Sequence, residues 1–288
     1  MTRPVRAAVA LSAVLLLASC GGGTASPEPG ASTASPSSSP AAPSSAPPAA
    51  AAPGVVAPSE CDDVDLSPGA AVPGDVLAAC VVAFSTAAGT GHEHLESGSD
   101  SAEVDFVYGE RSEMAGTMTT SEGPRQFVLT QDEAWVTFDG VWVRGDLTSS
   151  DPQALLAATV GEAYRAAADP SMTAAMIGSV GWEVQPDQDV LTQEDGTGLH
   201  AWRLEATEPF DALGARVVEM VVWLGSDHTV TGNQATVDVG GIQTTTVQRY
   251  SRWGLPVTIE PARPGLSPLP RCPRTSARRR RETRTRPG

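Results

Sequence analysis

The sequence contains no lysine, and its central part has few positive charges of any kind. Residues 60–260 hold 32 acidic side chains against 8 arginines, while the whole chain has a formal net charge of -15. A surface this acidic repels the phosphates of DNA and RNA and weakens adsorption to anionic lipid. The composition therefore excludes nucleic acid as a partner.

The chain also lacks an apolar run long enough to cross a bilayer, which takes about 20 residues. The apolar stretch 7–18 follows Arg3 and Arg6, an arrangement typical of a secretory signal. The stretch Leu-Ala-Ser-Cys that closes it resembles a bacterial lipobox, in which the thiol of Cys20 receives a diacylglycerol. We therefore expect residues 1–19 to be a lipoprotein signal peptide, and Cys20 to anchor the mature chain on the extracytoplasmic face of the cell membrane. The alternative is an ordinary secretory signal with an incidental cysteine.

Hydrophobic periodicity is missing from both flanks of the central region. From Gly21 to Ser59, 36 of 39 residues are Gly, Ala, Ser, Thr or Pro, and such a segment cannot bury enough apolar surface to fold. We interpret residues 20–59 as a disordered tether and residues 60–261 as the folded domain. Residues 262–288 hold 9 of the 19 arginines. This tail is either a basic arm for anionic polymers or lipid head groups, or a disordered extension without function, and we favour the second interpretation.

No motif for catalysis or for a cofactor is present. The sequence has neither GxSxG nor a glycine-rich phosphate loop, and no local signature joins its serines to a histidine. His92 and His94 would point to the same side of a strand, but they lack a clear third metal ligand. The acidic stretch 62–65 lacks the glycine and the distal glutamate of a calcium loop. We therefore expect no enzymatic activity, no cofactor and no metal site.

Two of the four cysteines, Cys61 and Cys80, lie in the predicted domain. In an oxidising compartment they are a candidate disulfide, which would stabilise the domain by about 3 kcal/mol in the chain-entropy view. The alternative is a buried thiol at Cys80, on an apolar helix, and a free thiol at Cys61.

Apolar periodicity predicts a few helices and many strands. Asp151 and Pro152 are placed as the cap and the first residue of a helix. An Asp-Gly turn at residues 139–140 predicts a hairpin. The order of strands, then helices, then strands, favours an α+β fold in which helices cover one face of an antiparallel sheet. The predicted helices span residues 75–88, 151–168 and 171–177, and the predicted strands span residues 104–108, 114–118, 127–129, 135–138, 141–144, 182–184, 199–206, 216–224, 229–239, 243–250 and 255–259.

The stretch VVEMVVWLGSDHTVTGNQATVDVGGIQTTTVQRYSRWGLPVTIEP, with Trp223, Tyr250, Trp253 and Pro256, resembles the end of actinobacterial lipoproteins of the LppX/LprAFG group. These proteins share the LolA-like fold, and the resemblance covers residues 75–261. It implies a curved antiparallel half-barrel with helices packed on its concave face, and some members hold lipid acyl chains between the sheet and the helices. The arginine-rich tail departs from the family pattern.

The tryptophans of the domain either fill its core or line an apolar cavity for a lipid tail. The leading hypothesis is a membrane-anchored lipoprotein that binds, and carries, a lipid or another hydrophobic small molecule. The alternative is a non-catalytic envelope scaffold or protein-interaction module with a filled core and an envelope protein as its partner. Under the leading hypothesis the expected cavity lining is Trp135, Trp142, Leu156, Val160, Tyr164, Trp202 and Trp223.

Overall fold

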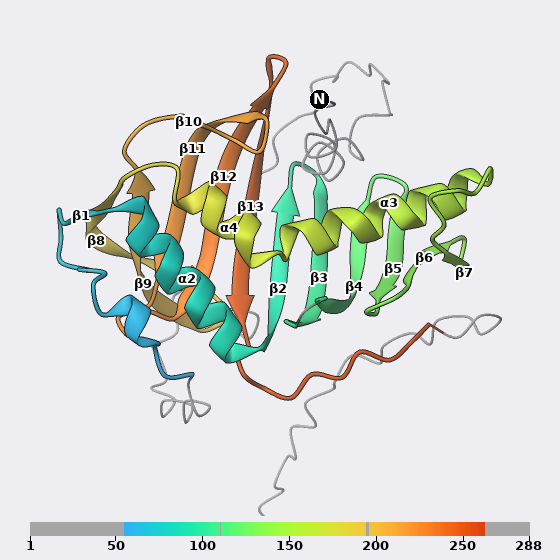
Figure 1. The fold of residues 1–288 in the computed structure, drawn as a ribbon, viewed down its shortest axis with the longest axis horizontal. Coiled ribbons are helices and arrows are strands. Elements are labelled where there is room, and N and C mark those ends of the chain that lie inside the picture. The colour runs from blue at the N-terminus through green and yellow to red at the C-terminus, as the bar shows by residue number, and fades with distance from the viewer. Residues whose placement is uncertain (1–54, 110, 194–195, 263–288) are drawn as a thin grey trace, which may run out of the picture.

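The computed structural model describes residues 55–109, 111–193 and 196–262. These residues form an α+β fold in which three α-helices lie on one face of a curved antiparallel sheet (Figure 1). The predicted fold class is confirmed. Cys20, most of the proposed tether and the arginine-rich tail lie outside the described residues, so what the sequence suggests for them stays a prediction.

The sheet has 13 strands in the described residues, and it does not close into a barrel because its edge strands β1 and β7 do not pair. Its order is β1-β8-β9-β11-β12-β13-β2-β3-β4-β5-β6-β7, with β10 beside β11. A bulge between Val184 and Gln188 interrupts the pairing of β8 with β9, and bulges of this kind bend a sheet. The strands are β1 Ala71–Val72, β2 Thr90–Ser97, β3 Asp100–Val107, β4 Glu113–Thr120, β5 Gly123–Leu129, β6 Ala134–Phe138, β7 Val141–Arg144, β8 Trp182–Thr192, β9 Gly198–Ala206, β10 Phe210–Ala212, β11 Ala215–Leu224, β12 Val230–Val239 and β13 Ile242–Ser251.

The three helices begin within one residue of their predicted starts, and the predicted cap of α3 at Asp151 is confirmed. The side chain of Asp151 accepts a hydrogen bond from the Gln153 N–H, and that of Asp169 accepts one from the Ser171 N–H. Each cap is followed by a proline at the first helical position, where the missing N–H is no loss. A short 3-10 turn, η1 Ser59–Cys61, precedes the three α-helices, which are α2 Gly74–Ala88, α3 Pro152–Ala167 and α4 Pro170–Ile177.

The core between helices and sheet consists of two apolar clusters side by side. The first gathers Leu77, Phe84 and Trp182 with residues of β11 and β12, and it lies against α2. The second gathers side chains of β3 to β6 against α3. Tyr250 and Trp253 pack against both clusters, so they join the two halves of the interior.

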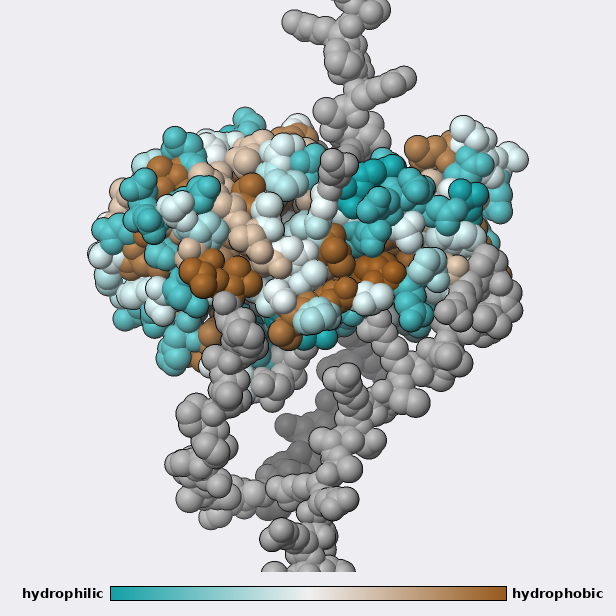
Figure 2. Space-filling model, turned by 60° about the horizontal axis from the view of Figure 1, so that its bottom comes forward, coloured by the Kyte–Doolittle hydropathy of each residue, from teal (hydrophilic) through white to brown (hydrophobic). Residues whose placement is uncertain are grey.

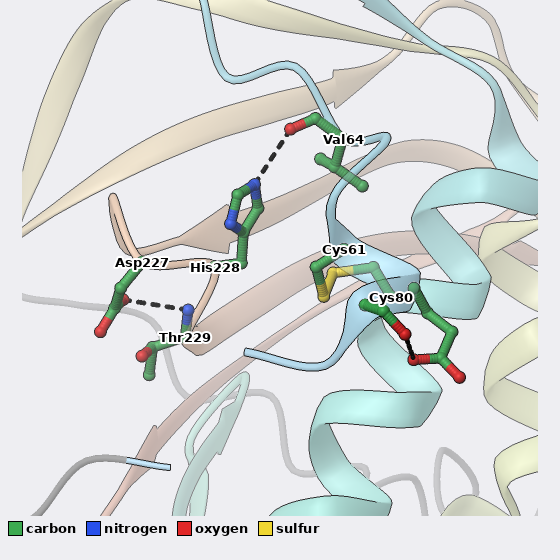
Figure 3. The surroundings of a disulfide bond; sticks show 8 residues. Cys61, Val64, Cys80, Asp227, His228 and Thr229 are labelled. Atoms are coloured by element: carbon green, nitrogen blue, oxygen red, sulfur yellow. Dashed lines mark hydrogen bonds between the residues drawn. A yellow bond between two sulfur atoms is a disulfide. The ribbon is translucent and has the colours of Figure 1, made fainter. Parts of the chain in front are cut away.

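A disulfide between Cys61 and Cys80 fastens the N-terminal segment to α2 (Figure 3). The two Cα atoms lie 4.4 Å apart, and both cysteines are buried in the first cluster. Close by, a ring nitrogen of His228 lies 3.0 Å from the Val64 carbonyl oxygen, which connects this segment to the turn after β11.

The Asp-Gly hairpin is confirmed, since Asp139 and Gly140 both have positive φ between β6 and β7. The strand predicted over residues 255–259 is wrong, because this segment is extended but pairs with no strand. Its nearest strand, β13, already has β12 and β2 on its two sides, and Pro256 has no N–H to donate. The segment leaves the sheet instead, and the Leu255 carbonyl accepts a hydrogen bond from the Thr90 hydroxyl.

Candidate functional site

The inner face of the sheet carries a polar centre at the junction of β2 and β13. Side chains alternate along β2, so Glu93 and Leu95 point toward the helices while His92 and His94 point away from them. Glu93 lies directly across from Tyr250 of β13, which packs against both apolar clusters. A carboxyl group therefore sits where the two halves of the apolar interior meet.

Few polar contacts hold this centre. The Gln248 amide nitrogen lies 2.5 Å from Glu93 Oε1 and donates to it. The Asn233 amide donates to the Tyr250 hydroxyl at 3.2 Å. No other hydrogen bond joins the Glu93 carboxylate to the described residues. Since an ionised carboxylate has about four acceptor positions, most of its hydrogen-bonding capacity is unused.

All three tyrosines of the chain surround Glu93, although they come from separate elements. Tyr108 follows β3, Tyr164 lies on α3 and Tyr250 on β13. Tyr164 stacks on Phe127 at 4.6 Å, and Tyr108 packs on Phe106 at 4.9 Å, between ring centroids. The rings are thus fixed by apolar contacts, and the phenol hydroxyls add hydrogen-bonding groups to the polar centre.

The pKa shifts at this centre come from burial and from the negative charge of Glu93. Burial raises the pKa of the Glu93 carboxyl above its usual value, although the Gln248 hydrogen bond and the positive charges of His92 and His94 oppose this. Burial, followed by the negative charge of Glu93, raises the pKa of Tyr108 and of Tyr164. The same two causes raise the pKa of Tyr250. The tyrosines therefore remain protonated donors at neutral pH.

No protein-family model and no curated protein matches the chain.

A small crevice leads toward the polar centre from the helix side. It has a volume of about 20 Å³, which is room for about one water molecule. Tyr108 lies at this crevice, where α2 faces the junction of α3 and α4 (Figure 1). The lining is Val82, Ser85, Thr86, Tyr108, Ala168, Pro170 and Thr173.

Several apolar side chains of the inner face are incompletely covered. Leu95, Met118, Leu156 and Tyr164 pack against the second cluster but are only partly buried. Figure 2 views the molecule from the end at which α2 stops and β2 begins, and apolar residues gather near the centre of this end between hydrophilic margins. Partly exposed apolar side chains therefore remain at the rim of the second cluster.

The seven residues expected to line one cavity are not brought together. Leu156, Val160 and Tyr164 face the sheet from α3, in the second cluster, whereas Trp202 packs against the first. Trp223 belongs to a separate cluster with Leu191, Ala201 and Val221.

The remaining two tryptophans lie on the outer face of the sheet. Trp135 alternates with Ala134 and Val136 of the second cluster, and its indole N–H donates to Glu133 at 3.0 Å. Trp142 lies opposite Thr137 on the same outer face. The expected lining does not hold for Trp135, Trp142 and Trp223, because the two-residue period of a strand turns each of them away from the helices.

His92 and His94 form a chain of ionic contacts on the outer face. Both ring nitrogens of His92 meet carboxylates, with Nδ1 at 2.7 Å from Asp105 and Nε2 at 2.9 Å from Glu103. His94 Nδ1 lies 2.6 Å from the other oxygen of Glu103, and its Nε2 lies 3.3 Å from Glu96. Within the described ranges, no three His, Cys, Asp or Glu side chains are arranged to hold a metal ion.

A groove of about 440 Å³ lies beside this chain of contacts. It runs between the outer face at β13 and β2 and the far end of β8, and the Arg249 guanidinium rests 5.9 Å from the Trp223 ring centroid next to it. Its lining is His94, Glu103, Thr192, Gln193, Arg249, Tyr250 and Ser251. Most of the residues that line the groove are polar or charged, in contrast to those of the inner face.

Neither Glu93 nor the convergence of the three tyrosines is predicted from the sequence. One signal was available, since Glu93 lies two residues before Leu95 and therefore on the same face of the strand. The second signal, the pairing of β13 with β2, joins residues more than a hundred positions apart and has no local signature.

Proposed function

We propose that the domain binds a hydrophobic ligand, a lipid acyl chain, between the inner face of the sheet and α3, and that it does so without catalysis. We also propose that the chain is related to LppX/LprAFG-type lipoproteins and that it carries the ligand within the envelope. One observation carries it: apolar side chains on facing surfaces of sheet and helix remain partly open to solvent. Leu95 and Met118 present such surface on the sheet, and Leu156 and Tyr164 present it on α3.

The interior must open for this function. A space of about 20 Å³ holds about one water molecule, so an acyl chain requires the helices to separate at the crevice between α2 and the junction of α3 and α4. Arg165 fastens α3 to the turn between β5 and β6, with its Nη2 at 3.0 Å from both the Thr130 and the Glu133 carbonyl oxygens. We therefore expect the α4 side of the crevice to move while α3 keeps its place.

Lipid extraction tests the proposal directly. The full chain is purified from a host that acylates cysteine, and non-covalently bound lipid is identified by mass spectrometry, which separates it from acyl groups attached to the protein. Met118→Trp should lower the bound lipid because the larger ring fills the space between β4 and α3. Thr119→Trp, at the exposed neighbouring position on the opposite face, is the matched control and should not.

Two results would reject this function. Wild-type protein that carries no lipid and takes up none from added acyl compounds would exclude a carrier. Equal loss of lipid in the Met118→Trp and Thr119→Trp variants would show that the bound lipid is adsorbed elsewhere. Circular dichroism must first show that both variants are folded.

A second function, the non-catalytic envelope scaffold, is favoured by a different observation. The larger of the two hollows described above lies outside the half-barrel, in the polar groove of about 440 Å³. Such a groove can accept a protein partner, because the charged and amide side chains along it can form hydrogen bonds across an interface. Retrieval of an envelope protein that is lost on Arg249→Ala but kept on Met118→Trp would support the scaffold over the carrier.

We also propose that an acylated Cys20 holds the domain on the extracytoplasmic face of the cell membrane. No helix in the described part of the chain has the length and apolarity needed for a membrane span. Metabolic labelling with palmitate should mark the wild-type chain and leave Cys20→Ala unlabelled. A labelled Cys20→Ala variant, or one that remains in the membrane fraction, would contradict the proposed anchor.

A further inference from the structure

The polar centre of the inner face has hydrogen-bonding capacity that the described residues do not use. Glu93 Oε1 accepts from Gln248, and Oε2 has no partner among these residues. The hydroxyls of Tyr108 and Tyr164 likewise make no hydrogen bond to another described residue. Three half-buried groups from β2, from the end of β3 and from α3 thus present, to the same part of the inner face, donors and acceptors that other described residues do not use.

We infer that the ligand of the inner face is a neutral lipid with a free hydroxyl group, and that this hydroxyl binds Glu93. The inference rests on the proposed function and specifies its ligand. Glu93 and the tyrosines lie where the two apolar clusters meet, so an acyl chain in either half places its polar end near the carboxyl.

The chemistry of the centre selects a hydroxyl over an anion. A hydroxyl donates to an ionised carboxylate and can also accept from a tyrosine or from a protonated carboxyl. A carboxylate or phosphate has only acceptors and is repelled by an ionised Glu93 on a surface of low polarity. No arginine faces Glu93 from the elements packed against it: the neighbouring groups are Gln248 and the three tyrosines inside, and His92 and His94 on the outer face.

The test compares three probes with one chain length on the full chain carrying Cys20→Ser, so that no attached acyl group competes. The probes are monolauroylglycerol, methyl laurate and laurate, and affinities are measured by calorimetry at about pH 8, where laurate is ionised. Monolauroylglycerol should bind about tenfold more tightly than methyl laurate, the effect of one hydrogen bond to a charged group. Laurate should bind more weakly than methyl laurate.

Glu93→Gln is the decisive variant, because it keeps the shape of the side chain and removes its charge. It should raise the affinity for laurate about tenfold and leave that for methyl laurate unchanged. Glu96→Gln makes the same chemical change on the outer face of the same strand, and it should alter none of the three affinities.

Two failures are distinguishable. Absence of binding by all three probes to the parent protein overturns both the proposed function and this inference. Binding of methyl laurate together with an affinity for laurate that does not rise in Glu93→Gln overturns the inference alone and leaves the hydrophobic site in place.

Discussion

Removing the disulfide tests how far the first cluster depends on its covalent link to the N-terminal segment. Cys61 and Cys80 are separated by 19 positions in the sequence. A cross-link that closes a loop of this length stabilises the folded state by about 3 kcal/mol in the chain-entropy model. For a domain of this size, that loss lowers the melting temperature by about 6 to 12 °C. Both sulfur atoms are also buried against apolar neighbours, so their removal adds a packing loss to the entropic one.

The perturbation is the double substitution Cys61→Ala and Cys80→Ala, and the assay is thermal unfolding followed by circular dichroism with and without a thiol reductant. Wild-type protein should melt at a lower temperature in reductant, and the variant should melt at one temperature in both conditions. A variant that melts within about 2 °C of the oxidised wild type would refute the reasoning, because the expected loss is several times larger.

Three further changes test the electrostatics and the anchoring of α3. Burial disfavours a charged His94, but its hydrogen bonds to Glu103 and Glu96 outweigh burial and raise the pKa of His94. The stability that this residue contributes is therefore complete below about pH 6.5 and is lost as the pH rises through the raised pKa. The free energy of unfolding of His94→Gln, measured in urea, should lack this pH dependence. Burial raises the pKa of Glu93, so wild-type stability should fall as the pH rises above about 4.5 relative to Glu93→Gln, and a constant difference between them in urea titrations would contradict this. Arg165→Ala should destabilise the domain by about 2 to 4 kcal/mol, because it leaves two backbone carbonyls without their charged donor; Arg144→Ala, whose side chain is exposed, should change the unfolding free energy by less than about 1 kcal/mol.

The predictable part of the fold is the part with local signals. The cap Asp151, followed by Pro152, sets the start of α3, and Asp169 with Pro170 marks the boundary between α3 and α4. The Asp-Gly turn between β6 and β7 requires two positive φ angles, which these residue types tolerate. Each of these features is decided within a few residues, so a single sequence is enough to find it.

The candidate site depends on pairings that are not local. Glu93 meets Gln248 and Tyr250 only because β13 lies beside β2, and Tyr164 reaches the same place only because α3 crosses the inner face. The alternation of side chains along a strand predicts that Trp135 and Val136 face opposite ways. Which of them faces the helices depends on the position of α3. The expected interior position therefore holds for Leu156 of α3 and for Trp202, but not for Trp135, Trp142 and Trp223.

The position of Glu93 lowers the stability of the folded domain, and this favours a functional role for the residue. Where a carboxyl pKa clearly shifts in the described part of the chain, Asp65 and Asp146 shift down because they accept hydrogen bonds in exposed turns, whereas Glu93 shifts up because it is buried. A glutamine would fill the same space and pair with Gln248 without the desolvation of a charge. Residues that lower stability without a compensating partner are expected where binding requires them. A half-buried carboxyl with one protein donor and three protonated tyrosines near it is therefore better explained by a ligand that supplies further hydrogen bonds than by the packing of the half-barrel.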